Sequence, residues 1–418
     1  GTVLSQSVWF QKGIESFMNP EQIEALVKQV LAQMSSGSSA STSGSSAAVP
    51  ATAKIAMLTG ERKIEVKEVP IPEVGDDEIL IKVEGCGVCG TDVHEWRGDP
   101  FGLIPVVLGH EGTGEVIALG KNVKKDTAGN PIKLGDKLVT SIIPCGECNI
   151  CKLHPDQPEM CENAGVYGLL GDKPDHRLNG WFATHILLKG GSTYFVVNDL
   201  SLDQRMLLEL AAVSVHAVER ANTTRLLNFN AKVLLQGCGP VGLMTIAVLK
   251  AFGINHIIAL DGDVQRLEMA KRPGAKTTVN FKEITDLQAR VEAVKAVTTG
   301  MGADFAFQCT GAPAAAAEVY KYVRRGGGLC EMGFFVNGGD CTINPHFDLC
   351  NKEITLVGSW TYGPHEYPLV IAFLRQAKEI GLPVEDLITH RFPLDQLNEA
   401  METNVAHKGI KIAYVAND

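Results

Sequence analysis

The sequence predicts an α/β protein in which a β-rich domain is followed by a doubly wound parallel sheet, with a tethered amphipathic helix ahead of both. Its 418 residues suggest two or three domains. From residue 54, short alternating strands are separated by Pro and Gly, whereas after residue 230 apolar strand runs alternate with helical segments. Five segments are expected: a helical segment, a linker, a β-rich domain, a parallel-sheet domain and a C-terminal segment, at residues 1–34, 35–53, 54–208, 209–350 and 351–418.

Composition and charge exclude several classes of protein. Hydrophobic residues make up 45% of the chain and charged residues 21%, which is typical of a globular protein with a buried core. The net charge of −10 argues against nucleic acid or an anionic membrane as the main partner. No apolar run reaches the roughly 18 residues of a membrane span, and the start does not resemble a secretory signal. We therefore expect a cytoplasmic protein that binds neither nucleic acid nor membrane.

Residues 20–34 have the pattern of an amphipathic helix. Asn19 can cap this helix and Pro20 suits its first position. The Ser/Gly-rich residues 35–53 are typical of a flexible linker, because they cannot bury enough apolar area to become ordered. Helix and linker together resemble the encapsulation peptides of bacterial microcompartment cargo enzymes, which dock on shell proteins. An oligomerisation helix, or a helix folded back on its own domain, is the alternative. The apolar face consists of Ile23, Leu26, Val27, Val30, Leu31 and Met34.

A thiol, an imidazole and a carboxylate recur on a short, glycine-punctuated stretch of the β-rich domain. Cys89 is followed by His110 and Glu111, and zinc prefers thiolate and imidazole ligands. Glu111 could be a ligand or a group that holds the ligands from behind. Glu209 lies in an apolar helical run, where a metal ligand is one interpretation and an exposed helix turn is the other. A Cys and a His about twenty residues apart can equally be packed without a metal.

Four cysteines form a second candidate metal site. Cys145, Cys148 and Cys151 are spaced by two intervening residues, and Cys161 follows. Four thiolates can surround one tetrahedral ion, and such a closed shell is structural because it leaves no open position for a substrate. An iron–sulfur cluster is the competing interpretation, since some ferredoxin motifs share this spacing. The second candidate zinc site nearby favours zinc.

A dinucleotide-binding motif follows the strand at residues 233–236. Gly237, Gly239 and Gly242 form G-x-G-x-x-G before a helix, and the next strand ends in Asp261. The glycines are expected to make the tight turn, admit the pyrophosphate and pack the helix, whose N-terminus meets the phosphates. Asp261 can accept hydrogen bonds from ribose hydroxyls and would repel a 2′-phosphate, which favours NAD over NADP. Further cofactor contacts are expected around this motif and in the loops after later strands: Pro240, Val241, Arg266, Cys309, Thr310, Gly333, Phe334 and Ser359.

These motifs, in this order, resemble the zinc-dependent medium-chain dehydrogenases, in particular the branch of sorbitol and threonine dehydrogenases. The resemblance rests on Cys89-Gly-Thr-Asp-x-x-His, on Gly109-His110-Glu111-Gly112, on the four-cysteine run and on the glycine motif, and it covers residues 54–418. It implies a GroES-like catalytic domain, completed by the C-terminal segment, beside a Rossmann domain. It also implies NAD(H) and two zinc ions (Zn2+) per chain, one catalytic and one structural.

The resemblance assigns roles to individual residues. Cys89, His110 and Glu209 match the positions of the catalytic zinc ligands. Thr91 and His94 match a proton relay between the alcohol and solvent. Whether Glu111, Glu209 or a water completes the zinc shell stays open.

The predicted function is zinc- and NAD(H)-dependent interconversion of a small alcohol or polyol and its aldehyde or ketone. If residues 20–34 are an encapsulation peptide, they bind a shell protein and the enzyme works inside a microcompartment. A threonine- or amino-alcohol-type dehydrogenase is one alternative, and a catalytically vestigial, shell-associated scaffold is another. By resemblance the protein forms a homodimer or homotetramer, with residues 341–360 as candidate contacts. Large side chains are candidates for the substrate pocket: Trp96, Phe101, Trp181, Phe334 and Trp360.

Overall fold

The computed structural model describes residues 49–417. The helix expected at residues 20–34 and most of the expected linker lie outside this range. The linker also ends earlier than expected, because β1 (Thr52–Gly60) begins before residue 53. Within the described range, no helix combines the length and apolar character that crossing a bilayer requires.

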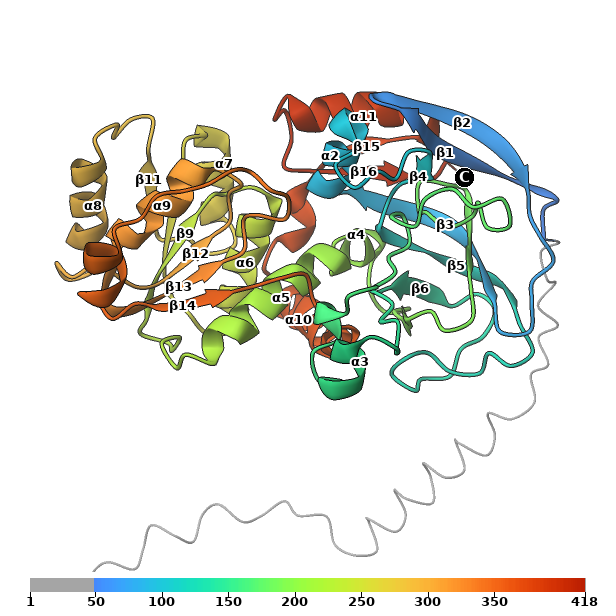
Figure 1. Ribbon diagram of the computed structural model, residues 1–418, viewed down its shortest axis with the longest axis horizontal. Coiled ribbons are helices and arrows are strands. Elements are labelled where there is room, and N and C mark those ends of the chain that lie inside the picture. Colours follow the sequence, from blue (N-terminus) through green and yellow to red (C-terminus); the bar gives the residue numbers. More distant parts are fainter. Residues whose placement is uncertain (1–48, 418) are drawn as a thin grey trace, which may run out of the picture. The chain divides into compact units, whose positions relative to one another are not determined.

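The first domain is built around two sheets (Figure 1). Its elements are β1, β2 (Lys63–Pro70), β3 (Ile79–Val88), α2 (Gly90–Gly98), β4 (Val106–Val107), β5 (Glu111–Leu119), β6 (Lys137–Thr140), α3 (Asn149–Leu153), η1 (Pro158–Met160), β7 (His185–Leu188), β8 (Tyr194–Val196), α4 (Leu202–Met206), β15 (Ile388–Phe392), η5 (Leu394–Gln396), α11 (Leu397–Val405) and β16 (Lys411–Val415). The smaller sheet has the order β2-β1-β4. The larger has the order β15-β16-β3-β5-β6-β8, and β7 also pairs with β3. Strands β15 and β16 follow the second domain in the chain, so the first domain is completed by a late segment.

The second domain is a six-stranded parallel sheet between helices (Figure 1). Its elements are α5 (Leu208–Asn222), β9 (Lys232–Gln236), α6 (Pro240–Ala251), β10 (His256–Asp261), α7 (Val264–Lys271), β11 (Thr277–Asn280), α8 (Leu287–Ala296), β12 (Ala303–Gln308), α9 (Pro313–Tyr322), β13 (Val323–Glu331), η2 (Pro345–Cys350), β14 (Thr355–Gly358), η3 (Pro364–Glu366), α10 (Tyr367–Glu379) and η4 (Val384–Leu387). The strand order β11-β10-β9-β12-β13-β14 is that of a dinucleotide-binding doubly wound sheet.

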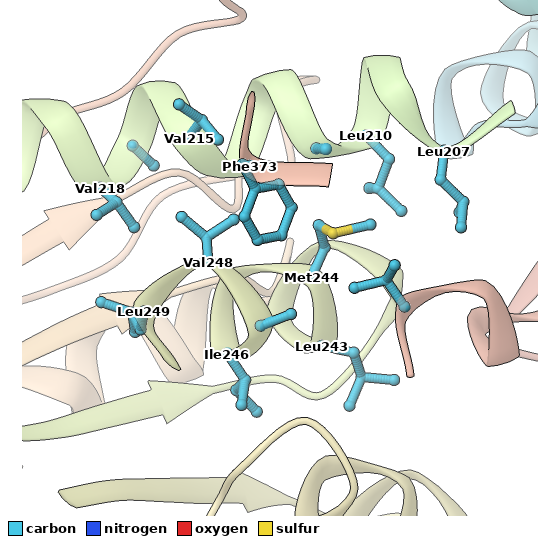
Figure 2. Close-up of a cluster of buried hydrophobic side chains, with 14 of the residues drawn as sticks. Leu207, Leu210, Val215, Val218, Leu243, Met244, Ile246, Val248, Leu249 and Phe373 are labelled. Carbon is cyan, nitrogen blue, oxygen red and sulfur yellow. The ribbon is translucent and has the colours of Figure 1, made fainter. Parts of the chain in front are cut away.

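Apolar residues on both faces of the sheet explain why helices cover both sides. In β9, Val233 and Leu235 belong to one hydrophobic cluster, whereas Leu234 belongs to another on the opposite face. Every residue of α6 from 242 to 249 is buried, as expected of a helix that is apolar all round. Figure 2 shows α5 facing α6, with Phe373 of α10 beside them.

Two elements cross the expected segment boundaries. Helix α5 begins at Leu208, so the boundary expected between residues 208 and 209 falls inside its first turn. Strand β14 pairs in parallel with β13 although it lies beyond residue 350. The parallel sheet therefore extends into the segment that was expected to belong to the first domain.

Candidate active site

Three neighbouring strands bring together residues that are far apart in the sequence. Cys89 directly follows β3, Glu111 begins β5 and Lys411 begins β16. In the sheet, the residue before Cys89 pairs with the residue after Lys411, and Gly87 pairs with Glu111. Because β16, β3 and β5 are adjacent, these side chains meet at one end of the sheet.

The expected ligand atoms of Cys89, His110 and Glu111 all lie within 4.8 Å of one another. His110 and Glu111 are buried, and Cys89 is partly buried at the N-cap of α2. Thiolate, imidazole and carboxylate are the three kinds of protein donor that bind zinc. The structure therefore collects a mixed donor set suitable for one ion.

Asp92 supports this cluster through contacts with the backbone on both sides of it and with the His110 ring. Its buried carboxylate accepts backbone N–H bonds from Cys89 (2.8 Å) and Gly109 (3.1 Å). Its Oδ1 lies 3.4 Å from His110 Nδ1, close enough for an ion pair but without hydrogen-bond geometry. Since Nδ1 is next to Asp92, Nε2 is the ring nitrogen left for a metal. Burial opposes a charge on His110, but Asp92 and then Cys89 raise the pKa of this imidazole well above its usual value.

Lys411 forms a buried ion pair with the Glu111 carboxylate. The two side chains are 3% and 0% exposed. Burial favours the neutral amine, but Glu111 and then Cys89 raise the pKa of Lys411 above its usual value. A Cβ at Gly87 would lie 1.9 Å from Glu111 Oε2 and 3.0 Å from Lys411 Cε, so the pair fits only beside a glycine. The lysine therefore fixes Glu111 from the side of β16.

Glu209, in the first turn of α5, is close to the cluster but is not one of the three grouped donors. Burial, and then the nearby Glu111 carboxylate, raise the pKa of Glu209 to about 7. His110, Lys411 and the Tyr362 hydroxyl act in the opposite direction. These effects place Glu209 beside the donors, on a different element from any of them.

The charges around this cluster fit a divalent cation. Acidic groups surround His110 on several sides, and Lys411 is the cation that contacts them. The acids that act on this cluster are Cys89, Asp92, Glu111 and Glu209. A Zn2+ ion would offset the negative charge that Lys411 leaves, and the available donors match its preferences.

Thr91 and His94 stand on the first turns of α2, three residues apart. Thr91 is buried, and its Oγ1 lies 3.6 Å from Cys89 Sγ. His94 is exposed to solvent. Burial of part of its ring, and then Arg97, lower the pKa of His94. The helix thus carries one hydroxyl beside the donor cluster and one imidazole at the surface.

The four clustered cysteines lie in residues 145–161, which we name the lobe. Their sulfur atoms are arranged as the ligands of a tetrahedral ion would be. Cys145 Sγ lies 4.0 Å from Cys151 Sγ, and Cys148 Sγ lies 3.9 Å from Cys161 Sγ. A tetrahedral zinc with Zn–S bonds of about 2.3 Å would place its sulfurs about 3.8 Å apart. The backbone N–H groups of residues 147 and 148 lower the pKa of Cys145 to about 6. The lobe therefore fits a closed tetrathiolate zinc site.

The three motif glycines have different neighbours. Gly237 has φ +95°, and a Cβ there would lie 2.5 Å from Thr310 Cγ2. A Cβ at Gly242 would lie 1.9 Å from the Gly237 carbonyl oxygen, so close packing requires glycine here. Gly239 faces open space and precedes Pro240 and Val241 at the start of α6. The open space at the helix N-terminus suits a phosphate group.

Asp261 closes the same turn at the end of β10. Its Oδ2 accepts a bond from the Cys238 N–H (2.7 Å), and its Oδ1 accepts one from the Asp263 N–H (2.9 Å). Each oxygen keeps a second lone pair for a ribose hydroxyl. Arg266, on α7, lies 3.2 Å from His407 Nδ1, which belongs to the first domain. Arg266 therefore bridges the two domains beside the turn.

The loops after β12 and β13 contact the glycine motif. A Cβ at Gly333 would lie 2.1 Å from the Thr310 carbonyl oxygen, so these loops touch through their backbones. The Cys309 N–H donates to the carbonyl of Gln236 at the end of β9 (2.9 Å). Burial raises the pKa of the Cys309 thiol well above its usual value, which makes it a packing group.

Ser359 and Phe334 lie in the same set of loops. The Ser359 N–H donates to the carbonyl of Glu331 at the end of β13 (2.9 Å). The Phe334 ring lies close to Gly338 within its own loop. The structure thus brings the expected cofactor residues to the carboxyl edge of the parallel sheet, where such sheets bind ligands.

Two of the candidate pocket residues belong instead to the core of the first domain. Trp96 and Trp181 are 1% and 0% exposed and lie in its hydrophobic cluster. Their indole N–H groups donate to Asn398 Oδ1 (3.1 Å) and Thr140 Oγ1 (3.0 Å). The expectation that they line the pocket was wrong, because large aromatic side chains also fill cores.

Sequence reasoning missed Lys411, Asp92 and Tyr362. Lys411 gave a signal, because it is a lone charge in the apolar strand pattern of residues 410–415 and such a charge needs a partner. Asp92 stands inside the motif that carries Cys89, but its role depends on how residue 109 folds back. Tyr362 gave no signal, since its proximity to Glu209 depends on the path of the chain after β14.

Comparisons with known proteins follow the same two-domain division. A family profile described as the alcohol dehydrogenase GroES-like domain matches residues 75–197, and one described as zinc-binding dehydrogenase matches residues 240–376. The chain is 32% identical over 365 residues to a sorbitol dehydrogenase of Bacillus subtilis, which covers 86% of this chain and 96% of that protein. It is 28% identical over 354 residues to a D-arabitol-phosphate dehydrogenase of Enterococcus avium, with coverages of 84% and 93%.

A solved structure has the same architecture. The crystal structure of an alcohol dehydrogenase from Thermotoga maritima superposes with a TM-score of 0.81 at 30% identity, covering 88% of this chain and all of that one. The expected fold class, a GroES-like domain with a Rossmann domain, is confirmed for the described residues.

Proposed function

This chain belongs to the zinc-dependent medium-chain alcohol and polyol dehydrogenases, and from this premise we propose that it interconverts a small alcohol or polyol and its aldehyde or ketone. It is an enzyme of the alcohol dehydrogenase type, and zinc and NAD(H) are the cofactors typical of its family. The observation that carries the proposal is the cluster of Cys89, His110 and Glu111 donors.

Cys89 and His110 would hold the catalytic ion, and either carboxylate or a water would complete its shell. Bound zinc would polarise the alcohol oxygen and lower its pKa. Glu111 is already paired with Lys411, whereas Glu209 approaches from another element, which makes Glu209 the more available third ligand. Asp92 keeps the His110 ring oriented.

Thr91 and His94 would move the alcohol proton to solvent. The buried Thr91 hydroxyl, beside Cys89, is placed to accept this proton. His94 is exposed, and its lowered pKa keeps it neutral near pH 7, so it can accept a proton from the interior. Their spacing along α2 is that of helix neighbours.

The second domain would hold NAD(H), which exchanges a hydride with the substrate carbon. Gly239 and the start of α6 leave room for the pyrophosphate, and Asp261 would bind the ribose. Arg266, in the first turn of the following helix α7, would lie near the same ribose. The loops that contain Thr310, Gly333 and Ser359 would surround the nicotinamide.

Metal analysis combined with an NAD(H)-linked activity screen tests this proposal. The screen includes simple alcohols, polyols, amino alcohols and the matching aldehydes. Two zinc ions per chain and turnover that a chelator abolishes are the expected results. One zinc without turnover would contradict the proposal and favour a vestigial scaffold, and turnover restricted to amino alcohols would favour a threonine-type enzyme.

We also propose that residues 20–34 attach the enzyme to a microcompartment shell. The support is the sequence pattern, in which apolar residues recur at helical spacing and a Ser/Gly-rich segment follows. A fluorescent protein that carries residues 1–48 should co-localise with shells, and a chain that begins at residue 49 should keep its turnover but not co-localise. Loss of turnover in the shortened chain would show instead that the segment belongs to the enzyme.

The proposed homodimer or homotetramer would form through the β14 edge of the parallel sheet. Strand β14 pairs with β13 on one side only, and Leu356 within it is 48% exposed. Phe347, in the preceding segment, is 62% exposed. Light scattering after size exclusion should give a mass of two or four chains; a monomer at micromolar concentration would contradict this proposal.

A further inference from the structure

Three exposed aromatic rings from both domains contact one another; we name them the aromatic rim. Phe335 stacks on Trp360 with ring centroids 5.1 Å apart and planes inclined by 6°. Phe101 meets Phe335 edge-to-face at 6.1 Å. The three rings are 45%, 41% and 45% exposed in the order Phe101, Phe335 and Trp360. Contiguous exposed apolar patches mark ligand-binding or protein-interaction sites.

In the sequence, Trp360 lies between a residue of the proposed cofactor site and a residue beside the metal site. One residue before it, Ser359 is bonded to the carboxyl end of β13, where the cofactor is proposed to bind. Two residues after it, Tyr362 is buried beside Glu209. Thr361 between them has φ +46°, a strained conformation for a β-branched residue. The turn therefore buries the Tyr362 side chain and leaves the Trp360 side chain exposed to solvent.

Phe335 and Phe101 come from loops that also flank the reaction site. Phe335 lies in the loop after β13, two residues beyond Gly333, which touches Thr310. Phe101 lies just beyond α2, the helix that Cys89 caps at its N-terminus. In Figure 1, α2 lies on the side of the first domain that faces the parallel sheet. Buried Glu95 accepts the Phe101 N–H (2.9 Å), which fixes this loop against the helix.

We propose that the aromatic rim is the outer wall of the substrate site and selects alcohols that carry an apolar alkyl or aryl substituent. The inference rests on the proposed function and narrows its substrate class. When such a substituent binds against the three rings, its apolar surface and theirs are both removed from water, which favours binding. A linear polyol has a hydroxyl on every carbon, and hydroxyls pressed against these faces would lose water without gaining a partner.

The test compares kcat/KM for 1,2-hexanediol and sorbitol, which have the same number of carbons. The wild-type enzyme should prefer 1,2-hexanediol by about tenfold or more. Trp360→Ala and Phe335→Ala should each lower the ratio of the two kcat/KM values by about tenfold. Phe229→Ala is the matched control: this ring is 78% exposed but outside the rim, and its removal should leave the ratio unchanged. Thermal unfolding and light scattering establish that each variant is folded and keeps its assembly state.

The outcomes separate this inference from the proposed function. A wild-type preference for sorbitol, or equal loss of both activities in folded Trp360→Ala and Phe335→Ala, would overturn the assignment of the rim while leaving the dehydrogenase intact. Turnover of no alcohol by the zinc-loaded enzyme would overturn the proposed function, and the substrate class with it.

Discussion

The two candidate metal sites contrast in how the chain builds them. The lobe takes four identical donors from residues 145–161, which form one loop with short helices. The site around Cys89 takes unlike donors from the ends of β3 and β5, Lys411 of β16 supports it, and Glu209 of α5 lies nearby. We call the lobe the local site, because it needs only the correct spacing of cysteines along the sequence. We call the site around Cys89 the dispersed site, because it needs the correct register between strands of the sheet. The difference predicts that substitutions at the two sites have different consequences.

Cys89→Ser should cause the largest loss of activity, and it tests whether the site around Cys89 is needed for catalysis rather than for folding. The weaker oxygen donor should lower kcat/KM by about a thousandfold or more while the fold is kept. Zinc content should fall from two ions per chain to one, by atomic emission analysis. Cys86→Ser is the control, because this buried thiol lies just upstream but outside the donor cluster. Unchanged activity in Cys89→Ser would contradict the assignment of the site.

Lys411→Met tests whether the dispersed site depends on its lysine. Removal of the lysine leaves the Glu111 carboxylate buried without a partner, which should lower the free energy of unfolding by about 3–5 kcal/mol. Denaturant titration measures this loss. The double variant Glu111→Gln, Lys411→Met should recover part of it, because no unpaired charge remains. Lys411→Arg keeps the charge; if it and Lys411→Met lose equal stability, the effect is steric.

Cys148→Ser should affect stability far more than chemistry. The lobe is a partly exposed loop, so its loss of zinc should unfold it locally and cost about 1–3 kcal/mol. Zinc content should again fall to one ion, while kcat per folded chain should stay within about threefold. Cys350→Ser, an exposed thiol outside the lobe, is the control. A loss of kcat as large as that of Cys89→Ser would show that the lobe takes part in catalysis.

Glu95→Gln should have the smallest effect, and only above mildly acidic pH. Burial, and then the neighbouring Asp99, raise the pKa of Glu95 to about 7. The folded protein thus keeps a proton that the unfolded chain releases, so wild-type stability should fall as pH rises from about 4.5 to about 7. Gln cannot ionise and can still accept the Phe101 N–H. The variant should therefore be about 1–2 kcal/mol more stable above pH 7 and nearly equal below pH 4.5.

Thermal unfolding of both proteins from pH 4 to 8 measures this difference. Parallel profiles would contradict the prediction, because they would show that folding leaves the pKa of Glu95 unchanged.

The same contrast explains what could be predicted from the sequence. Local patterns identified the lobe cysteines, the glycine motif and most strands, because their geometry follows from nearby residues. Cys89 and His110 could be proposed as partners, but the pairing of Glu111 with Lys411 depends on the register of three strands. Trp96 and Trp181 could not be separated from Trp360 by residue type, since core and pocket attract the same side chains. Their burial depends on tertiary packing.

The late position of β16 has a consequence for biosynthesis. A ribosome makes Cys89, His110 and Glu111 long before Lys411, with the whole Rossmann domain between them. Until β16 emerges, residues 85–88 of β3 lack their partner strand and Glu111 lacks its lysine counter-ion. The nascent first domain is therefore incomplete both as a sheet and as a charged site. Its final assembly must wait until residues 411–415 leave the ribosomal exit tunnel. A chain stalled before that point exposes a strand edge to other nascent chains on the same messenger RNA.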